Sequence, residues 1–371
     1  MSGRLVPYIP FSGSLVFEPE ESGRTGPCLV HTGFTPAWFR RHMELDCGAA
    51  WHNDPERRRR TYVEMGRALN RVFPDLRLGG RPEEAVGTIS QVNTCAFMAA
   101  LFGHEIVYRA DGWPDNRGAP LTDGQAERLR VPEFRSTAVF EGLVRQMDEI
   151  ERRWGRIEGE LNYQGVLNTA FRLRGQKVFE DMALAPARAH HLLDVVCDTM
   201  MQVIDAVHGR QEASGVAKGY FATANCVVNM ISGAHYREFV LPRDRRLAAH
   251  FPRFGVHNCA WRVDPYVPGY AALGPIRYLD FGFDSDFALL KRTFPDAALA
   301  PMFSPVDLER RTPQQVRAQL ERLRDQIGEC RIILADIDAG TPDERVRGFL
   351  RLAAELWGVP AEELVPTVRN F

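Results

Sequence analysis

Two residues that could bind a metal, His257 and Cys259, stand two positions apart in the segment FGVHNCA. The apolar residues before them predict a β-strand over 254–260, and side chains two apart on a strand point to the same face. An imidazole and a thiolate on one face can bind the same Zn²⁺ ion. The pattern also fits a hydrogen-bonded histidine and a buried cysteine in a barrel wall. Its place at a strand end is what favours a metal site.

A catalytic zinc ion usually takes three protein ligands and keeps one position open. The third ligand must then come from another strand end, and the segment RIILADIDAG, with a strand over 331–335, offers one. Asp336, Asp338 and Cys330 are the candidates. Cys330 precedes the strand, so we expect it at the opposite end of the barrel, whereas both aspartates follow the strand.

Other polar and aromatic residues are candidates for binding a substrate. They are Asp111, Trp113, Tyr163, Asn229 and Asp280. Asp280 lies in the apolar run YLDFGF, and Asp111 and Trp113 lie in DGWPD, just after the strand-like run HEIVY. The segment DGWPD is also an ordinary turn sequence, and spacing alone does not separate pocket residues from polar groups satisfied in the core.

The last third of the chain alternates strand and helix signals. Strands are predicted over 254–260, 278–283, 297–303 and 331–335. Helices are predicted over 285–292, after the capping box at Thr312 and after a second one at Thr341. Short connections between such units are typical of parallel βα structure, and no glycine-rich nucleotide-binding loop follows a strand. A barrel is therefore favoured, with its chemistry at the ends of the strands.

The earlier part of the chain is less regular. Residues 1–35 are rich in Gly, Pro and Ser and are expected to form an irregular arm. Asp54 and Pro55 predict the start of a helix. A strand over 104–108 and helices over 134–154, 186–208 and 227–240 follow.

The bulk composition excludes several classes of protein. The chain has 371 residues with 45% hydrophobic and 25% charged residues, and its formal net charge is −2. This balance gives no indication of a nucleic-acid or membrane partner. The chain lacks an apolar run of spanning length and a secretory signal, and its seven cysteines include no CxxC pair. We therefore expect reduced thiols and a cytoplasmic protein.

Seven segments of the chain resemble, in order and spacing, the uroporphyrinogen decarboxylase superfamily, which includes zinc-dependent methyltransferases that serve corrinoid proteins and coenzyme M. The segments are CAFMAALFGHEIVY, RGAPLTDGQAERL, LNTAFRLRGQKVFEDM, ISGAHYREFVLP, FGVHNCAW, TFPDAALAPMFSP and ILADIDAGTPDERV. They extend over roughly residues 90–355. The resemblance implies an α/β fold with a single (β/α)8 TIM barrel over 81–371. An N-terminal arm and helices over 1–80 would pack on that barrel.

Two departures distinguish the branches of this superfamily. The decarboxylases carry an RQAGR-type segment near the N-terminus, where this chain reads TPAWFRRHMELDCG, and a histidine after the last strand, where it reads LADIDAG. The methyltransferases carry His-x-Cys after one strand and a cysteine after the last strand. His257 and Cys259 match the first part, and the last-strand cysteine falls on Asp338. The resemblance therefore implies a zinc site formed by His257, Cys259 and Asp338.

The function expected from these observations is zinc-dependent methyl transfer between a small-molecule substrate and a thiol or corrinoid acceptor. The corrinoid would belong to a separate partner protein, and a homodimer is the expected assembly if the chain associates with itself. The runner-up is a metal-free decarboxylase-like lyase that uses Asp111 and Tyr163. A third hypothesis is a barrel that binds a tetrapyrrole or corrinoid without catalysis.

Overall fold

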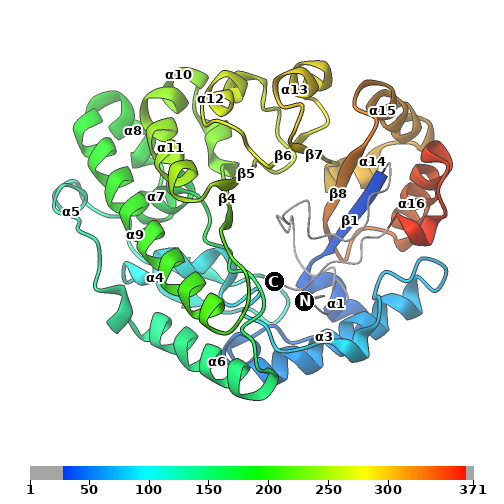
Figure 1. Ribbon diagram of the computed structural model, residues 1–371, viewed down its shortest axis with the longest axis horizontal. Helices are drawn as coiled ribbons and strands as arrows, with labels where there is room; N and C mark the ends of the chain where they lie inside the picture. The colour runs from blue at the N-terminus through cyan, green and yellow to red at the C-terminus, as the bar shows by residue number, and fades with distance from the viewer. Residues whose placement is uncertain (1–27, 365–371) are drawn as a thin grey trace.

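The computed structural model describes residues 28–364 and contains a six-stranded parallel sheet. The strands follow the order β1, β8, β7, β6, β5 and β4 across the sheet. Their bounds are Cys28–Phe34 (β1), Cys330–Ile337 (β8), Ala298–Met302 (β7), Tyr278–Gly282 (β6), Arg253–His257 (β5) and Tyr220–Ala224 (β4). Figure 1 shows the helices arranged around the outside of these strands. The chain thus has the α/β barrel architecture that its sequence predicts.

Two extended segments lie between β1 and β4 in the chain and contribute to the wall. Thr88 and Glu158 form a parallel bridge, and the Ile89 amide donates to the carbonyl of Glu158. The Ala224 amide, at the end of β4, donates to the carbonyl of Gln164. Residues 88–89 and 158–164 thus contribute single contacts without forming regular strands.

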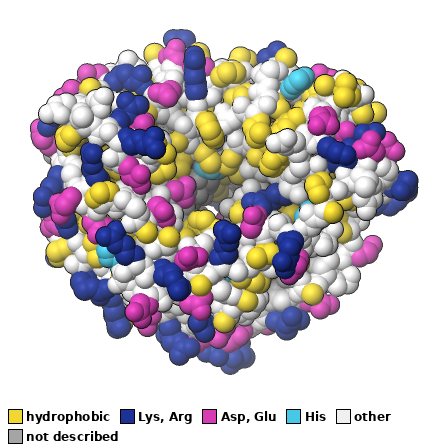
Figure 2. Space-filling model, turned by 180° about the vertical axis from the view of Figure 1, so that it is seen from behind, with side chains coloured by type: hydrophobic (Ala, Val, Ile, Leu, Met, Phe, Trp, Pro, Cys, Tyr) yellow, Lys and Arg dark blue, Asp and Glu magenta, His cyan; other side chains and the backbone are white. Residues whose placement is uncertain are grey.

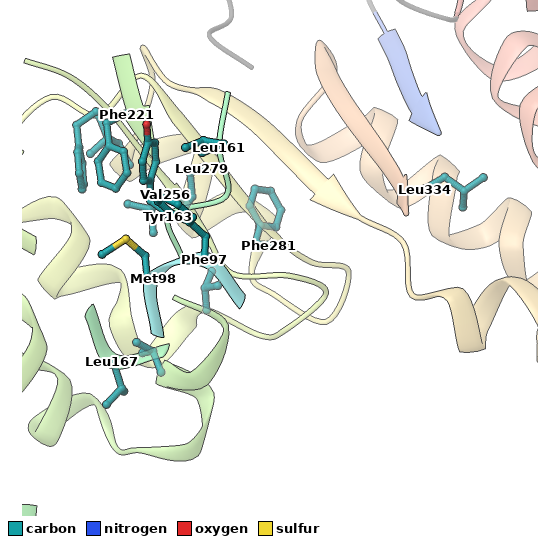
Figure 3. Packing of buried hydrophobic residues seen from close by; sticks show 14 of the residues in the cluster. Phe97, Met98, Leu161, Tyr163, Leu167, Phe221, Val256, Leu279, Phe281 and Leu334 are labelled. Atoms are coloured by element: carbon teal, nitrogen blue, oxygen red, sulfur yellow. The ribbon is translucent and has the colours of Figure 1, made fainter. Parts of the chain in front are cut away.

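Successive side chains along each barrel strand alternate between two buried layers. One layer packs toward the helices and includes Val256, Leu279 and Leu334. Figure 3 shows Val256 and Leu279 with Phe97, Tyr163 and Phe221, while Leu334 lies apart from them on another strand. The second layer fills the barrel interior with Tyr278, Ala300, Met302, Ile333 and Ala335. The side chains of His257 and Asp280 fall on this inner side, because they alternate with the outer residues Val256, Leu279 and Phe281.

Sixteen α-helices connect and cover the strands over residues 28–364. The first eight are α1 (Pro36–Met43), α2 (Ala49–Asn53), α3 (Pro55–Val72), α4 (Phe97–Leu101), α5 (Asp123–Glu127), α6 (Ala138–Trp154), α7 (Val166–Arg174) and α8 (Lys177–Leu184). The others are α9 (Pro186–Ala213), α10 (Gly233–His235), α11 (Leu241–His250), α12 (Val267–Ala271), α13 (Phe287–Thr293), α14 (Pro305–Arg310), α15 (Pro313–Gln326) and α16 (Asp343–Trp357).

The capping signals of the sequence largely fix where these helices begin. Asp54 caps α3, and Thr312 and Gln315 form the predicted capping box of α15. The second predicted box does not form. Pro342 is the N-cap of α16, and the Thr341 hydroxyl donates instead to Glu309.

Two sequence predictions need correction. Residues 28–34, expected in the irregular arm, form β1, which pairs with β8, so part of the 1–80 segment belongs to the sheet. The rest of the arm, residues 1–27, lies outside the described residues. The predicted strand over 104–108 is confirmed as β2 (Glu105–Val107), which pairs with β3 (Asp115–Arg117) in a separate antiparallel hairpin. The helix over 227–240 is broken into 3-10, α and π turns.

None of the described helices is long and apolar enough to span a membrane.

Candidate metal centre

The ends of two neighbouring strands bring Cys226, His257 and Cys259 together. The Cys226 and Cys259 sulfur atoms lie 3.0 Å apart, and the Cys259 sulfur lies 3.1 Å from His257 Nε2. One ligand atom from each residue lies within 4.8 Å of the other two. Because β4 and β5 are parallel and hydrogen-bonded, the residues that follow them emerge at the same end of the barrel.

Local backbone geometry aims each side chain at the others. β5 ends at His257, so Cys259 is not on the strand as the sequence predicted but in the turn that follows. Its left-handed backbone, with φ of 57°, turns the chain back so that its sulfur approaches His257. Just after β4, the Asn225 amide donates to the His257 carbonyl over 2.6 Å and holds the neighbouring Cys226 beside β5.

Asp280 lies behind His257 and is fully buried. Its Oδ2 lies 2.5 Å from His257 Nδ1 and also accepts from the Tyr278 hydroxyl over 3.1 Å. Its Oδ1 accepts from the backbone amide of Asn258 over 2.6 Å. The pairing with Asp280 keeps the proton on Nδ1 and leaves Nε2 facing the two sulfur atoms.

The pKa values of Cys226, His257 and Cys259 depend on one another. Burial lowers the pKa of His257, but the Asp280 carboxylate and the two thiols outweigh it, so this pKa lies well above its usual value. The hydrogen bond from Cys259 holds the pKa of Cys226 well below its usual value, and the charge of His257 adds to that effect against burial. Donating this hydrogen bond raises the pKa of Cys259. The geometry therefore makes Cys226 the more acidic of the two thiols.

This donor set fits zinc. Two thiol sulfurs and one imidazole nitrogen are the ligand types that Zn²⁺ prefers, and three protein ligands are the number found in catalytic sites. The carboxylate on the far ring nitrogen of a ligating histidine is the usual outer partner in such sites.

The third member of the group is Cys226, where the sequence predicted Asp338, Asp336 or Cys330. Asp338 is exposed and accepts a hydrogen bond of 2.6 Å from the Thr35 hydroxyl. Cys330 begins β8 and is paired in register with Cys28, so it lies at the opposite end of the strand, as expected. Asp336 lies near the group but is not part of it.

The sequence gives no indication of Cys226 because β4 carries a weak strand signal. The run YFATA contains only two aromatic residues and one β-branched residue, and Asn-Cys follows it directly. A polar residue just after such a run is the signal that could have found it.

The predicted substrate-binding residues lie in different parts of the structure. Asp280 lies behind His257, and the Asn229 side chain donates to the Cys226 carbonyl. Tyr163 is buried in the core, and its ring contacts those of His208 and Phe221. Figure 3 shows Tyr163 near Phe221. Asp111 is exposed in a loop, and Trp113 packs at the edge of the main core. Asp280 and Asn229 thus contact the metal-ligand group directly.

The molecule is hollowed near the centre of one face. Figure 2 shows this hollow bordered mainly by hydrophobic side chains, with a histidine at its edge. A barrel that is open at one end would give such a depression.

No protein-family model matches this chain, and no curated protein sequence matches it. Among solved structures, a methyltransferase from Methanosarcina mazei is similar, with 15% identity and a TM-score of 0.61. The match covers 90% of this chain and 93% of that protein. A B12-independent methionine synthase from Shewanella sp. W3-18-1 matches at 12% identity with a TM-score of 0.38, over 81% of this chain and 88% of that one. The first likeness shows a shared fold, which is the α/β barrel that the sequence predicts.

Proposed function

We propose that this protein is a zinc-dependent methyltransferase that acts on a small-molecule substrate at the carboxyl end of its barrel strands. The observation that carries the proposal is the convergence of Cys226, His257 and Cys259, with Asp280 holding the far side of the imidazole. The similar fold of a protein described as a methyltransferase agrees with this choice. Because identity to that protein is low, the proposal rests on the residues of this chain.

In this proposal Cys226, His257 and Cys259 hold the metal. When bound, zinc supplies a Lewis acid that activates the heteroatom of the substrate. Asp280 keeps the proton of His257 on Nδ1, so the lone pair of Nε2 stays available. Asn258 and Tyr278 fix Asp280 in turn through their own hydrogen bonds. The group is thereby preorganised, and little rearrangement is needed when substrate binds.

The methyl acceptor or donor would be a thiol or a corrinoid carried by a separate protein. Large hydrophobic side chains that are exposed on the described surface include Met230 at 58% and Trp261 at 55%. These two residues follow Cys226 and Cys259 closely on the loops after β4 and β5. Exposed apolar residues beside a reactive centre are suited to contact a partner or an apolar substrate.

The metal-free lyase draws less support from the site. That hypothesis needs Asp111 as an acid and Tyr163 as an orienting group. Tyr163 lies in the core, and burial raises its pKa well above the usual value, while Asp111 lies on an exposed loop. The two residues therefore have different surroundings.

Metal analysis of purified protein tests the proposal. We expect about one zinc ion per chain in the wild type and a loss of about tenfold or more in Cys226→Ser and Cys259→Ser. Cys95→Ser is the matched control, because Cys95 lies outside the group and should leave the metal content unchanged. Wild-type protein that binds no zinc when it is supplied, or a Cys226→Ser variant that keeps full content and activity, would refute the proposal.

A further inference from the structure

Tyr270 is a fully buried residue of the short helix α12. Its ring packs against that of Tyr236, with 5.2 Å between the ring centroids and an angle of 76° between their planes. The helix comes this close because Gly269 has no side chain, and a Cβ there would lie 2.4 Å from the Tyr236 ring. The packing of α12 thus fixes where the Tyr270 hydroxyl lies.

The Tyr270 hydroxyl is hydrogen-bonded to two asparagine side chains. It donates to Oδ1 of Asn258, the residue before Cys259. It is also hydrogen-bonded to the side chain of Asn225, the residue before Cys226. A tyrosine hydroxyl can donate and accept at once, so a single oxygen serves both asparagines. Tyr270 therefore joins the two chain segments that follow β4 and β5.

Asn258 connects Tyr270 to the carboxylate that orients His257. Its Nδ2 donates to the Asp280 carbonyl over 3.1 Å, and its backbone amide donates to Asp280 Oδ1 over 2.6 Å. Asp280 Oδ2 in turn pairs with His257 Nδ1. One end of the Asn258 amide group is thus bound by Tyr270 and the other by β6, so these hydrogen bonds fix its orientation.

Asn225 is held by a similar set of buried contacts. Its Nδ2 donates to Oδ2 of the buried Asp244 over 2.8 Å, and its backbone amide donates to the His257 carbonyl over 2.6 Å. The Tyr236 hydroxyl donates to the same Asp244 oxygen over 2.9 Å. The position of Cys226, the next residue along the chain, therefore depends on a buried network as well as on β4.

Three buried tyrosines, Tyr236, Tyr266 and Tyr270, pack together here, and their hydroxyls have different partners. The ring centroid of Tyr266 lies 5.8 Å from that of Tyr236 and 6.3 Å from that of Tyr270. Tyr236 donates to Asp244, and Tyr266 donates to the carbonyl of Ile231. Of these three hydroxyls, that of Tyr270 bonds residues next to ligands after both β4 and β5. The contacts of Tyr270 thus converge on the metal-ligand group, whereas those of Tyr266 serve the packing of a loop.

Resting on the proposed zinc centre, we propose that Tyr270 is a positioning residue that holds Cys226 in place relative to His257 and Cys259 before the metal binds. A metal that takes ligands from two strands must remove any freedom between them, and that ordering weakens its binding. A buried hydrogen-bond network restricts this freedom in the folded chain. The ordering is then part of folding and does not weaken the binding of zinc.

A double-mutant cycle on zinc affinity tests the assignment, with competition against a chromophoric chelator as the measurement. The cycle compares the effect of Tyr270→Phe in the wild type with its effect in Cys226→Ala. Phenylalanine keeps the ring and removes the hydroxyl alone. Tyr266→Phe is the matched control, because it removes a hydroxyl of the same buried cluster that bonds the Ile231 carbonyl.

We expect the zinc dissociation constant to rise about tenfold in Tyr270→Phe, as when other outer partners of metal ligands are removed. In the Cys226→Ala background the same change should raise it by less than about threefold, because the segment that Tyr270 positions no longer supplies a ligand. Tyr266→Phe should leave zinc affinity unchanged in both backgrounds. An equal loss from Tyr270→Phe in the two backgrounds, or wild-type affinity in Tyr270→Phe, would overturn the assignment.

Urea denaturation of the zinc-free proteins separates positioning from folding. The midpoint for Tyr270→Phe should match that for Tyr266→Phe, because each variant loses one buried hydroxyl. A Tyr270→Phe protein that does not fold, or that unfolds at clearly lower urea than Tyr266→Phe, would mean that the hydroxyl serves the fold and would overturn the assignment. Wild-type protein that binds no zinc would refute the proposed function and this assignment with it, whereas equal losses in a zinc-binding protein count against Tyr270 alone.

Discussion

Asp280 offers the sharpest test of how the group is held together. We expect Asp280→Asn to weaken zinc binding without removing a ligand. The carboxylate accepts from the Asn258 amide and the Tyr278 hydroxyl, and its Oδ2 pairs with His257 Nδ1. An asparagine side chain has one acceptor oxygen and an NH2 group that can only donate. At least one of the three donors must then face another donor inside the barrel.

The magnitude follows from burial and from the role of His257. Asp280 is fully buried, and a buried donor left without an acceptor costs about 1–3 kcal/mol. Loss of the partner that orients a ligating histidine costs about 10- to 100-fold in metal affinity, or about 1.4–2.7 kcal/mol. We therefore expect the zinc dissociation constant of Asp280→Asn to rise within that range.

The assay is zinc competition against a chromophoric chelator at fixed pH. Asp264→Asn is the control, because Asp264 accepts from the backbone amide of Asp286 and is not part of the group. Tyr278→Phe should give a smaller loss, because it removes one donor and leaves the His257 pairing intact. Wild-type zinc affinity in a folded Asp280→Asn protein would refute the reasoning.

The other predictions concern Asp244 and Gly282. Burial raises the pKa of Asp244 from its usual 3.8 to about 6, because the folded state favours the protonated carboxyl. The stability that this group contributes to the folded state is fully present below pH 3.8 and is lost as the pH rises through 6. Relative to the wild type, Asp244→Asn should gain up to about 3 kcal/mol of unfolding free energy between pH 3.8 and 7. Urea denaturation at several pH values measures this gain. A difference in unfolding free energy between the two proteins that stays constant with pH would contradict the prediction. A Cβ at Gly282 would lie 2.2 Å from the Ala260 carbonyl oxygen. Gly282→Ala should therefore displace the turn that carries Cys259 and lower zinc content, whereas Gly340→Ala, with open space at its Cβ position, should not.

The sequence predicts the regular parts of the barrel well. β8 contains the apolar run IILA, β6 has apolar residues on both sides of Asp280, and α15 begins at a complete capping box. These signals are local, because burial on both faces and capping act over a few residues. β1 was missed because its residues CLVHTGF mix polar and glycine positions with apolar ones, although all seven are buried.

The candidate site was only half predictable for a different reason. His257 and Cys259 are two residues apart, so one segment shows them both. Cys226 is 31 positions before His257, and only the pairing of β4 with β5 makes the two neighbours. Asp336 would be placed on the outer side by alternation, and only the shifted register with β1 places it inside. Sequence periodicity predicts neither the proximity of Cys226 to His257 nor the side on which Asp336 lies, because both depend on how the strands pair.

Cys259 and Asp336 share a feature that links strain to function. Both are residues with side chains that adopt a left-handed backbone just after or near the end of a strand, where glycine would be less strained. Glycine at either position would relieve about 1 kcal/mol but would remove the sulfur or the carboxyl group. The chain keeps the reactive side chain and bears the strain, and the packed strands below hold each residue in place. A Cys259→Gly substitution that stabilises the fold and lowers zinc content would therefore be the expected outcome of a site that trades stability for chemistry.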